Sequence, residues 1–224
     1  MTSTAIVTGA SRGLGLALTR ELVARGWRVV IDARDLSDAA AGLDGQVLAL
    51  QGDVVDESHR RALVAAAGSR IDLLVNNASS LGPSPLPPLR AYPLAALADV
   101  YRVNALAPLR LVQLALPAMP RGARILNLTS DAAVEAYETW GGYGSSKAAL
   151  EQLTNVLAAE HPELRVYSVD PGDMRTRMQQ DAFPGEDISD RPPPEESVPG
   201  LLALIEGELA SGRYAARELA AATR

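Results

Sequence analysis

The sequence predicts a single α/β domain in which a doubly wound, mostly parallel sheet of six or seven strands carries helices on both faces. Three observations support this prediction. Short apolar runs alternate with longer amphipathic stretches, which is the pattern of a parallel sheet covered on both sides. Apolar residues make up 47% of the 224 residues, enough for one sizeable core. A glycine-rich turn at residues 9–15 joins the first apolar run to the first amphipathic stretch.

The expected strands are short apolar runs bounded by turn residues or by amphipathic stretches. They lie near residues 4–8, 28–33, 47–51, 71–76, 123–129 and 164–169. The expected helices lie near residues 13–25, 56–67, 94–117, 141–160 and 196–210. Proline-rich stretches at residues 83–88 and 192–194 interrupt this alternation and are expected to be loops.

The glycine-rich turn has the spacing GxxxGxG, with Gly9, Gly13 and Gly15, and not the commoner GxGxxG. Glycines let the backbone turn tightly and approach a ligand closely. Between a strand and a helix start, such a turn can hold a pyrophosphate on backbone N–H groups. A plain tight turn would also explain it, but its place after the first strand favours phosphate binding.

The chain has 21 basic residues, of which one, Lys147, is a lysine and the others are arginines. It follows Tyr143 by four residues, so both side chains lie on one face of the expected helix. A cation beside a phenol favours the phenolate and lowers the pKa of the tyrosine towards working pH, as a general acid or base requires. We interpret Tyr143 and Lys147 as a functional pair, because chance would rarely leave the single lysine there.

The composition excludes several classes of function. The chain has no cysteine, so it has no disulfide, thiolate nucleophile or iron–sulfur cluster. His59 and His161 lie far apart among charged residues, so we expect surface positions and no metal site. A net charge of −6 and a pI near 5.0 disfavour a nucleic-acid partner. No apolar run reaches membrane-spanning length and the first strand begins early, so we expect no membrane association, no signal peptide and a cytoplasmic protein.

These motifs resemble those of the short-chain dehydrogenases/reductases (SDR) of the classical type, from Thr4 to about Arg177. The matching motifs occur in the family's order. They are the cofactor loop Thr8–Gly15, the pair Asp53-Val54 after a strand, Asn76-Asn77-Ala78 with Ser79 in place of a glycine, Asn104 in a long helix, Ser130 placed 13 residues before Tyr143, and Pro171-Gly172 followed by Thr176. The resemblance implies a Rossmann-type fold and an NAD(P)-dependent oxidoreductase that interconverts a carbonyl and an alcohol group of a small molecule.

The resemblance also implies a role for each matched residue. Tyr143 would pass a proton to the carbonyl oxygen as a hydride arrives from the nicotinamide, and Ser130 would hold that oxygen by a hydrogen bond. Lys147 would lower the pKa of Tyr143 and bind the nicotinamide ribose, while Asn104 would hold a water that links Lys147 to solvent. The residues implied in cofactor binding are Gly9, Ser11, Arg12, Gly13, Leu14, Gly15, Arg34, Asp53, Val54, Asn77, Ala78, Tyr143, Lys147, Pro171, Gly172 and Thr176.

The end of the second expected strand predicts a preference for NADP(H). Relatives that use NAD(H) carry an acidic residue there, and the matching position is Ala33. Arg34 follows it and Arg12 stands in the glycine-rich turn, so two guanidinium groups could clamp a 2′-phosphate. Asp32 leaves an alternative open, because shifting the alignment by one residue would make it a ribose-binding carboxylate and favour NAD(H).

The substrate is a small carbonyl or alcohol compound of unknown identity. By position relative to the motifs, the residues expected to line its pocket are Ser80, Ala132, Tyr137, Trp140, Asp173 and Phe183. The polar segment 173–195 contains the only phenylalanine together with Met174 and Met178, so we expect a lid over the substrate. The alternative is that these apolar side chains only anchor the loop.

The C-terminal part departs from the family. Residues 212–215 are the only candidate for the family's seventh strand, which we therefore expect to be short or displaced. We expect a homodimer through the helices near 94–117 and 141–160, and a homotetramer stays open. Two other functions also stay open: a nucleotide-binding regulator that has lost turnover, and an epimerase or dehydratase of the same fold. The four catalytic side chains disfavour the first, and the short C-terminal region disfavours the second.

Overall fold

The computed structural model describes residues 2–37 and 46–222. The strands of these residues form one parallel sheet in the order β3-β2-β1-β4-β5-β6-β7. Their bounds are β1 Thr4–Val7, β2 Arg28–Ala33, β3 Val47–Gln51, β4 Leu73–Asn76, β5 Arg124–Leu128, β6 Arg165–Asp170 and β7 Gly212–Ala215. The predicted doubly wound parallel sheet is confirmed, because the strand order runs one way from β1 to β3 and the other way from β4 to β7.

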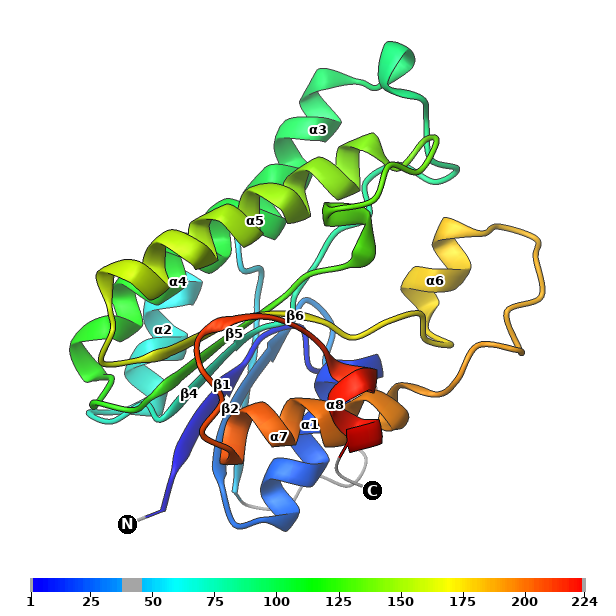
Figure 1. Cartoon of the computed structure of the whole chain (residues 1–224). Helices are drawn as coiled ribbons and strands as arrows, with labels where there is room; N and C mark the ends of the chain where they lie inside the picture. The colour runs from blue at the N-terminus through cyan, green and yellow to red at the C-terminus, as the bar shows by residue number, and fades with distance from the viewer. Residues whose placement is uncertain (1, 38–45, 223–224) are drawn as a thin grey trace.

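Helices cover both faces of the sheet (Figure 1). One layer holds α2, α4 and α5, with α3 at its end, and the opposite layer holds α1, α7 and α8. The bounds are α1 Gly13–Ala24, α2 Glu57–Ala67, α3 Leu94–Tyr101, α4 Ala107–Ala115, α5 Gly141–Glu160, α6 Arg177–Ala182, α7 Val198–Glu206 and α8 Ala216–Ala222. The short helix α6 stands apart from both layers, on the segment between β6 and α7 (Figure 1).

The ends of the helices follow local sequence signals. Helix α2 begins with Glu57, whose negative charge favours a helix N-terminus, and it ends just before Gly68, which has φ +88°. Helix α5 ends at Glu160, just ahead of Pro162, which disfavours helical geometry in the residue before it. These signals explain why the sequence located both helices to within about a residue.

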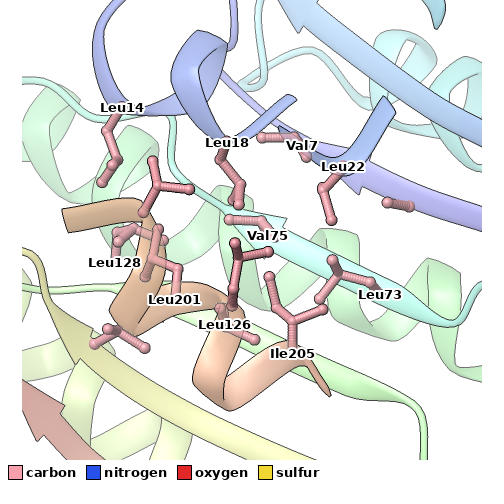
Figure 2. Packing of buried hydrophobic residues seen from close by; sticks show 14 of the residues in the cluster. Val7, Leu14, Leu18, Leu22, Leu73, Val75, Leu126, Leu128, Leu201 and Ile205 are labelled. Atoms are coloured by element: carbon pink, nitrogen blue, oxygen red, sulfur yellow. The ribbon is translucent and has the colours of Figure 1, made fainter. Parts of the chain in front are cut away.

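The core lies on both faces of the sheet because alternate strand residues point to opposite sides. Val7 and Ile31 pack under α1 and α7, whereas Ile6 and Val30 pack under α2 and α4. In Figure 2 the leucines of α1 lie on strand residues and on side chains of α7. The labelled members are Val7, Leu14, Leu18, Leu22, Leu73, Val75, Leu126, Leu128, Leu201 and Ile205. Each fully buried side chain of this size contributes about 1.5–3 kcal/mol.

The expected helix at 94–117 is interrupted. Residues Arg102–Leu106 form a π-helical turn between α3 and α4, and Leu116–Ala118 form a 3-10 turn. Pro108 supplies a physical reason: it has no N–H for the carbonyl of Asn104, four residues earlier, and its ring clashes with that carbonyl in a regular helix. The prediction of one continuous helix was therefore wrong, although the proline that breaks it was visible.

The C-terminal part contains more regular secondary structure than the sequence indicated. Residues Gly212–Ala215 form β7 beside β6 at the edge of the sheet, so the short candidate is the seventh strand. Helices α6 and α8 were not anticipated. The expected helix 196–210 is the shorter α7, which a 3-10 turn at Pro194–Ser197 precedes. Within the described residues no helix has the length and apolarity needed to cross a membrane.

Candidate active site

A cavity of about 880 Å³ opens along the carboxyl ends of the strands. The ends of β1 and β4 lie side by side there, at the point where the strand order reverses, which is where such sheets bind ligands. Most residues that the sequence singled out line this cavity. They are Gly9, Ser11, Arg12, Gly13, Leu14, Arg34, Asp53, Val54, Asn77, Ala78, Ser80, Ser130, Trp140, Tyr143, Lys147, Pro171, Gly172, Asp173 and Thr176.

Five of the expected residues do not line it. Gly15 lies inside α1, where an added Cβ would come within 2.6 Å of Asn77 Nδ2, so glycine permits this close packing. Ala132 is buried against Tyr143, and Asn104 is fully buried.

The other two residues expected to line the substrate pocket also lie off its wall. Tyr137 is 46% exposed and donates its hydroxyl to Asp131 Oδ2 at 3.0 Å. Phe183 packs against Trp140, with ring centroids 5.9 Å apart. Of the expected substrate residues, Ser80, Trp140 and Asp173 therefore face the cavity, while Ala132, Tyr137 and Phe183 support or flank it.

The glycine-rich turn is held against the end of β4. Gly9 has φ +64°, and a Cβ there would lie 2.8 Å from Ala78 Cα, so only glycine fits. The hydroxyl of Thr8 accepts the backbone N–H groups of Asn77 and Ala78, both at 3.0 Å. The amide of Asn77 in turn donates to the carbonyls of Thr8 and Gly9. These contacts fix the turn before helix α1, whose N-cap residue makes no side-chain cap.

Asp32 is buried behind this turn. Its Oδ1 accepts the N–H of Gly9 at 2.7 Å, and its Oδ2 lies 3.0 Å from His59 Nε2. Burial raises the pKa of the Asp32 carboxyl, although the Gly9 and His59 contacts oppose this rise. The expectation that His59 is a surface residue was wrong, because its side chain is 9% exposed and packs beneath the sheet end. His161 is partly exposed and pairs with Glu163.

The side chains at the end of β2 point alternately to the two faces. Asp32 shares the face of Val30, on the α2 side, while Ala33 shares the opposite face with Ile31. Ala33 and the exposed residues Arg12 and Arg34 line the cavity next to the glycine-rich turn.

Helix α5 carries Tyr143 and Lys147, and both side chains are buried, with exposed fractions of 8% and 2%. Lys147 Nζ lies 5.5 Å from the centroid of the Tyr143 ring and donates to the carbonyl of Leu128 at 2.7 Å. The first turn of α5 contains glycines because it packs closely: a Cβ at Gly144 would lie 2.4 Å from the Ala132 carbonyl oxygen.

The tyrosine does not show the expected lowering of its pKa. Burial, the largest influence, raises the pKa of Tyr143 well above its usual value. The same desolvation lowers the pKa of Lys147 to about 7. Both pKa values shift in the direction that keeps the buried side chain uncharged. The hydroxyls of Ser79 and Ser130 oppose the rise, because each can turn its one proton from its present acceptor to the Tyr143 oxygen. Tyr143 therefore holds its proton at neutral pH, which is the form that can donate it.

Asn104 uses its whole side chain in hydrogen bonds. Its Oδ1 accepts the Ser80 N–H at 2.8 Å and the Ser79 hydroxyl at 3.2 Å. Its Nδ2 donates to the Ser80 carbonyl at 2.8 Å and to the Ser146 hydroxyl at 2.9 Å. The amide therefore braces the loop after β4 against α5. The Asn104 side chain therefore has no further donor or acceptor position for the water that it was expected to hold.

Ser130 lies two residues after the end of β5, beside Asp131, an acid that the sequence did not single out. Its hydroxyl donates to Asp131 Oδ1 at 2.8 Å and accepts the Ala132 N–H at 3.2 Å. To hold a carbonyl oxygen, this hydroxyl must redirect its one proton from Asp131 to that oxygen.

Two further residues near the site were missed. Ser79 lines the cavity and links Asn104 to Tyr143; its departure from the family's glycine was the available signal. Arg213 of β7 donates to Glu151 at 3.0 Å, to the Ser130 carbonyl at 3.3 Å and to Asp170 at 3.4 Å. It fastens the ends of β5 and β6 to α5, but nothing local in the sequence indicated this.

No group of metal-ligating side chains occurs in the part of the chain that the structure describes.

The family model of the short chain dehydrogenases matches residues 3–187. A 3-oxoacyl-(acyl-carrier-protein) reductase of rhamnolipid biosynthesis in Pseudomonas aeruginosa is 36% identical over 78% of this chain and 73% of its own length. The 7alpha-hydroxysteroid dehydrogenase of Escherichia coli K12 is 33% identical over 77% of this chain and 71% of its own. A solved protein of Shigella flexneri, in complex with NADP, superposes with a TM-score of 0.84 at 26% identity, over 96% of this chain and 97% of that one.

Proposed function

The chain belongs to the short-chain dehydrogenase family and is an NAD(P)-dependent oxidoreductase; from this premise we propose that it moves a hydride between NADP(H) and a carbonyl or alcohol group, with Tyr143 as proton donor or acceptor. The observation that carries the proposal is the burial of Tyr143 and Lys147 side by side in the wall of the cavity. The whole chain would act as one cofactor-binding and catalytic domain.

The residues of the glycine-rich turn fit a dinucleotide. The first N–H groups of α1 have no side-chain cap, so they can bind a pyrophosphate, which the helix dipole also favours. Gly9 and Gly13 both have positive φ and leave the backbone open to close approach. When bound, the cofactor supplies the hydride, and the protein supplies orientation and electrostatics. Asp53, Val54 and Ala78 line the same cavity.

The side chains of the protein would carry out the proton transfer. In the reductive direction Tyr143 gives its phenolic proton to the carbonyl oxygen as that oxygen gains charge, so the product is the alcohol. Ser130 donates a hydrogen bond to the same oxygen, which favours the developing charge. The ammonium of Lys147 favours the phenolate that is left and can bind ribose hydroxyls of the cofactor. The backbone carbonyl of Asn104 would hold the water that returns a proton towards Lys147.

The end of β2 supports a preference for NADP(H). Asp32 is turned to the α2 face and held by Gly9 and His59, which argues against a role in binding the ribose. Ala33 leaves the position of the family's acidic residue neutral. Arg12 and Arg34 are exposed beside it, so two guanidinium groups are available for a 2′-phosphate.

The substrate wall is mixed in chemistry. Trp140 and Met178 are apolar, whereas Asp173 and Ser80 are polar, and all four line the cavity. Segment 173–195 contributes much of this wall, including α6, which supports its role as a lid. By their names, the two relatives described above act on a 3-oxoacyl-(acyl-carrier-protein) and on a 7alpha-hydroxysteroid. A ketone or secondary alcohol of intermediate polarity is the substrate class that this wall fits.

A homodimer is the assembly that we propose. Leu94 of α3, Leu106 in the π-helical turn and Val156 of α5 are exposed by 79%, 55% and 43%. Apolar side chains exposed on these helical segments are suited to an interface. Light scattering of the parent and of a Leu106→Glu variant tests this: a monomeric parent would contradict it.

The direct test of the activity is NADPH oxidation, followed with a panel of ketones and aldehydes. We expect turnover of at least one compound by the parent and its loss in Tyr143→Phe. A Tyr137→Phe variant is the matched control, since Tyr137 lies off the cavity wall. Equal turnover by parent and Tyr143→Phe would contradict the proposal.

A further inference from the structure

A buried carboxylate and an imidazole connect two parts of the cofactor cavity. Asp32 Oδ1 accepts the N–H of Gly9, the first residue of the glycine-rich turn, at 2.7 Å. Asp32 Oδ2 lies 3.0 Å from Nε2 of His59, on the first turn of α2. An ionised carboxylate can only accept, so the imidazole is then the donor of this second bond.

The imidazole is itself held by the next loop. His59 packs so closely on Gly52 that a Cβ there would lie 2.2 Å from His59 Nδ1. Gly52 precedes Asp53 and Val54, which line the cavity. The pair therefore bridges the glycine-rich turn and the loop after β3.

His59 is the side chain that favours the ionised form of Asp32. The Asp32 side chain is 1% exposed, and its contact with His59 favours the carboxylate, whereas the nearby Asp53 disfavours it. Arg12 and Arg34 are exposed at the mouth of the same part of the cavity.

We propose that His59 is a positioning residue that sets cofactor choice, by holding the Asp32 carboxylate against Gly9 and away from the adenosine ribose. This inference rests on the proposed use of NADP(H). Asp32 lines the cavity directly before Ala33, the position next to the proposed 2′-phosphate clamp. A carboxylate turned into this part of the cavity would repel a 2′-phosphate, and it could accept a hydrogen bond from the 2′-hydroxyl of NAD(H).

Loss of His59 would release the carboxylate because a buried charge with one partner removed is unfavourable. Turning towards the open cavity lets it regain polar contacts. The expected result is a changed ratio of affinities, with weaker NADPH binding and equal or tighter NADH binding. A merely structural role of His59 would weaken both cofactors together.

The test uses the purified full chain and measures Kd for NADPH and NADH near pH 8, where a freed carboxylate is ionised. The variant His59→Met removes the donor and keeps an unbranched side chain, whereas His59→Gln keeps a donor. We expect His59→Met to lower the preference for NADPH at least about tenfold and His59→Gln to keep most of it.

The decisive variant combines His59→Met with Asp32→Asn. Without the charge there is nothing to repel the phosphate, so the double variant should recover the parental ratio even if its stability is lower. If His59→Met alone fails to fold, the ratio of Kd values is measured on the double variant instead. A double variant that keeps the lowered ratio, or a His59→Met variant that weakens both cofactors equally, would overturn the inference.

The parent alone tests the proposed NADP(H) preference, which fails if the parent binds NADH more tightly. The inference about His59 concerns how the ratio of the two Kd values changes between parent and variants. It can therefore fail while the parent's preference for NADPH holds.

Discussion

Lys147 Nζ lies 5.5 Å from the centroid of the Tyr143 ring, one helical turn along α5, and donates to the carbonyl of Leu128. Lys147 therefore approaches the phenol from its face while a backbone carbonyl fixes its ammonium. Both side chains are buried. Tyr143 keeps its proton at neutral pH because burial raises its pKa, whereas Lys147 loses its charge as the pH rises through its lowered pKa of about 7.

This placement predicts that Lys147→Arg loses activity although the positive charge is kept. A guanidinium is planar and larger than an ammonium, so it cannot reproduce the short bond to Leu128 within the buried pocket. We expect kcat to fall at least about tenfold, equivalent to roughly 1.4 kcal/mol of transition-state stabilisation. Steady-state kinetics and cofactor Kd measure this. Near-parental turnover would mean that the single lysine is an accident of composition.

The same lysine predicts a pH dependence of stability. Its pKa is about 7 in the folded chain, against 10.5 as the ordinary value, so the unfolded chain binds more protons between these pH values. The contribution of Lys147 to the free energy of unfolding should therefore rise as the pH rises from about 7 towards 10. Below pH 7 the lysine is charged in both states, and the full free-energy cost of burying its charge is present. The Lys147→Met variant lacks this cost.

Chemical denaturation of parent and Lys147→Met at several pH values measures the effect. The extra stability of the variant should be largest at pH 6–7 and should shrink by about 1 kcal/mol or more towards pH 9.5. The raised pKa of Tyr143 is shared by both proteins and cancels in the difference. A difference that does not change with pH would contradict the lowered pKa of Lys147.

Much of this arrangement was predictable because its signals are local. Short apolar runs located the strands, and the glycine-rich turn located the first helix. The break at Asn104 was predictable from Pro108, but the long apolar pattern concealed it. The Asp32–His59 contact joins residues 27 apart, and Arg213 contacts Glu151 from 62 residues away. Such contacts depend on how the elements pack, so no local pattern could reveal them.

Asn104 should be essential for stability as well as for turnover. Replacement by alanine leaves the Ser80 N–H and carbonyl and the Ser146 hydroxyl without the partner they have now. Each unsatisfied buried group costs about 1–3 kcal/mol, so the free energy of unfolding should fall by at least about 2 kcal/mol. Denaturation with urea measures this, with Gln113→Ala on the surface of α4 as control. An equal fall in the free energy of unfolding for both substitutions would contradict the proposed role of the Asn104 side chain in joining the loop after β4 to α5.

Ser79 should tune the proton affinity of Tyr143. Its hydroxyl donates to Asn104 Oδ1, and it favours the phenolate when it turns that one proton to the Tyr143 oxygen. Ser79→Ala removes that support, so the pKa of Tyr143 should rise further. The onset of alcohol oxidation, which needs the base form, should move to higher pH, and Ser79→Gly should behave alike. The control is Ser84→Ala, on the cavity rim. Unchanged pH–rate profiles in both Ser79 variants would contradict this role.

The central claim, that Tyr143 is the proton donor in a reaction that uses NADP(H), is tested most directly by kcat and NADPH Kd for Tyr143→Phe beside the parent. Removal of a general acid costs about 10²–10⁴-fold in rate. The predicted result is a fall of kcat in that range with the Kd of NADPH within about threefold of the parent. A phenylalanine variant that reduces the same carbonyl compound at the parental rate would contradict the claim.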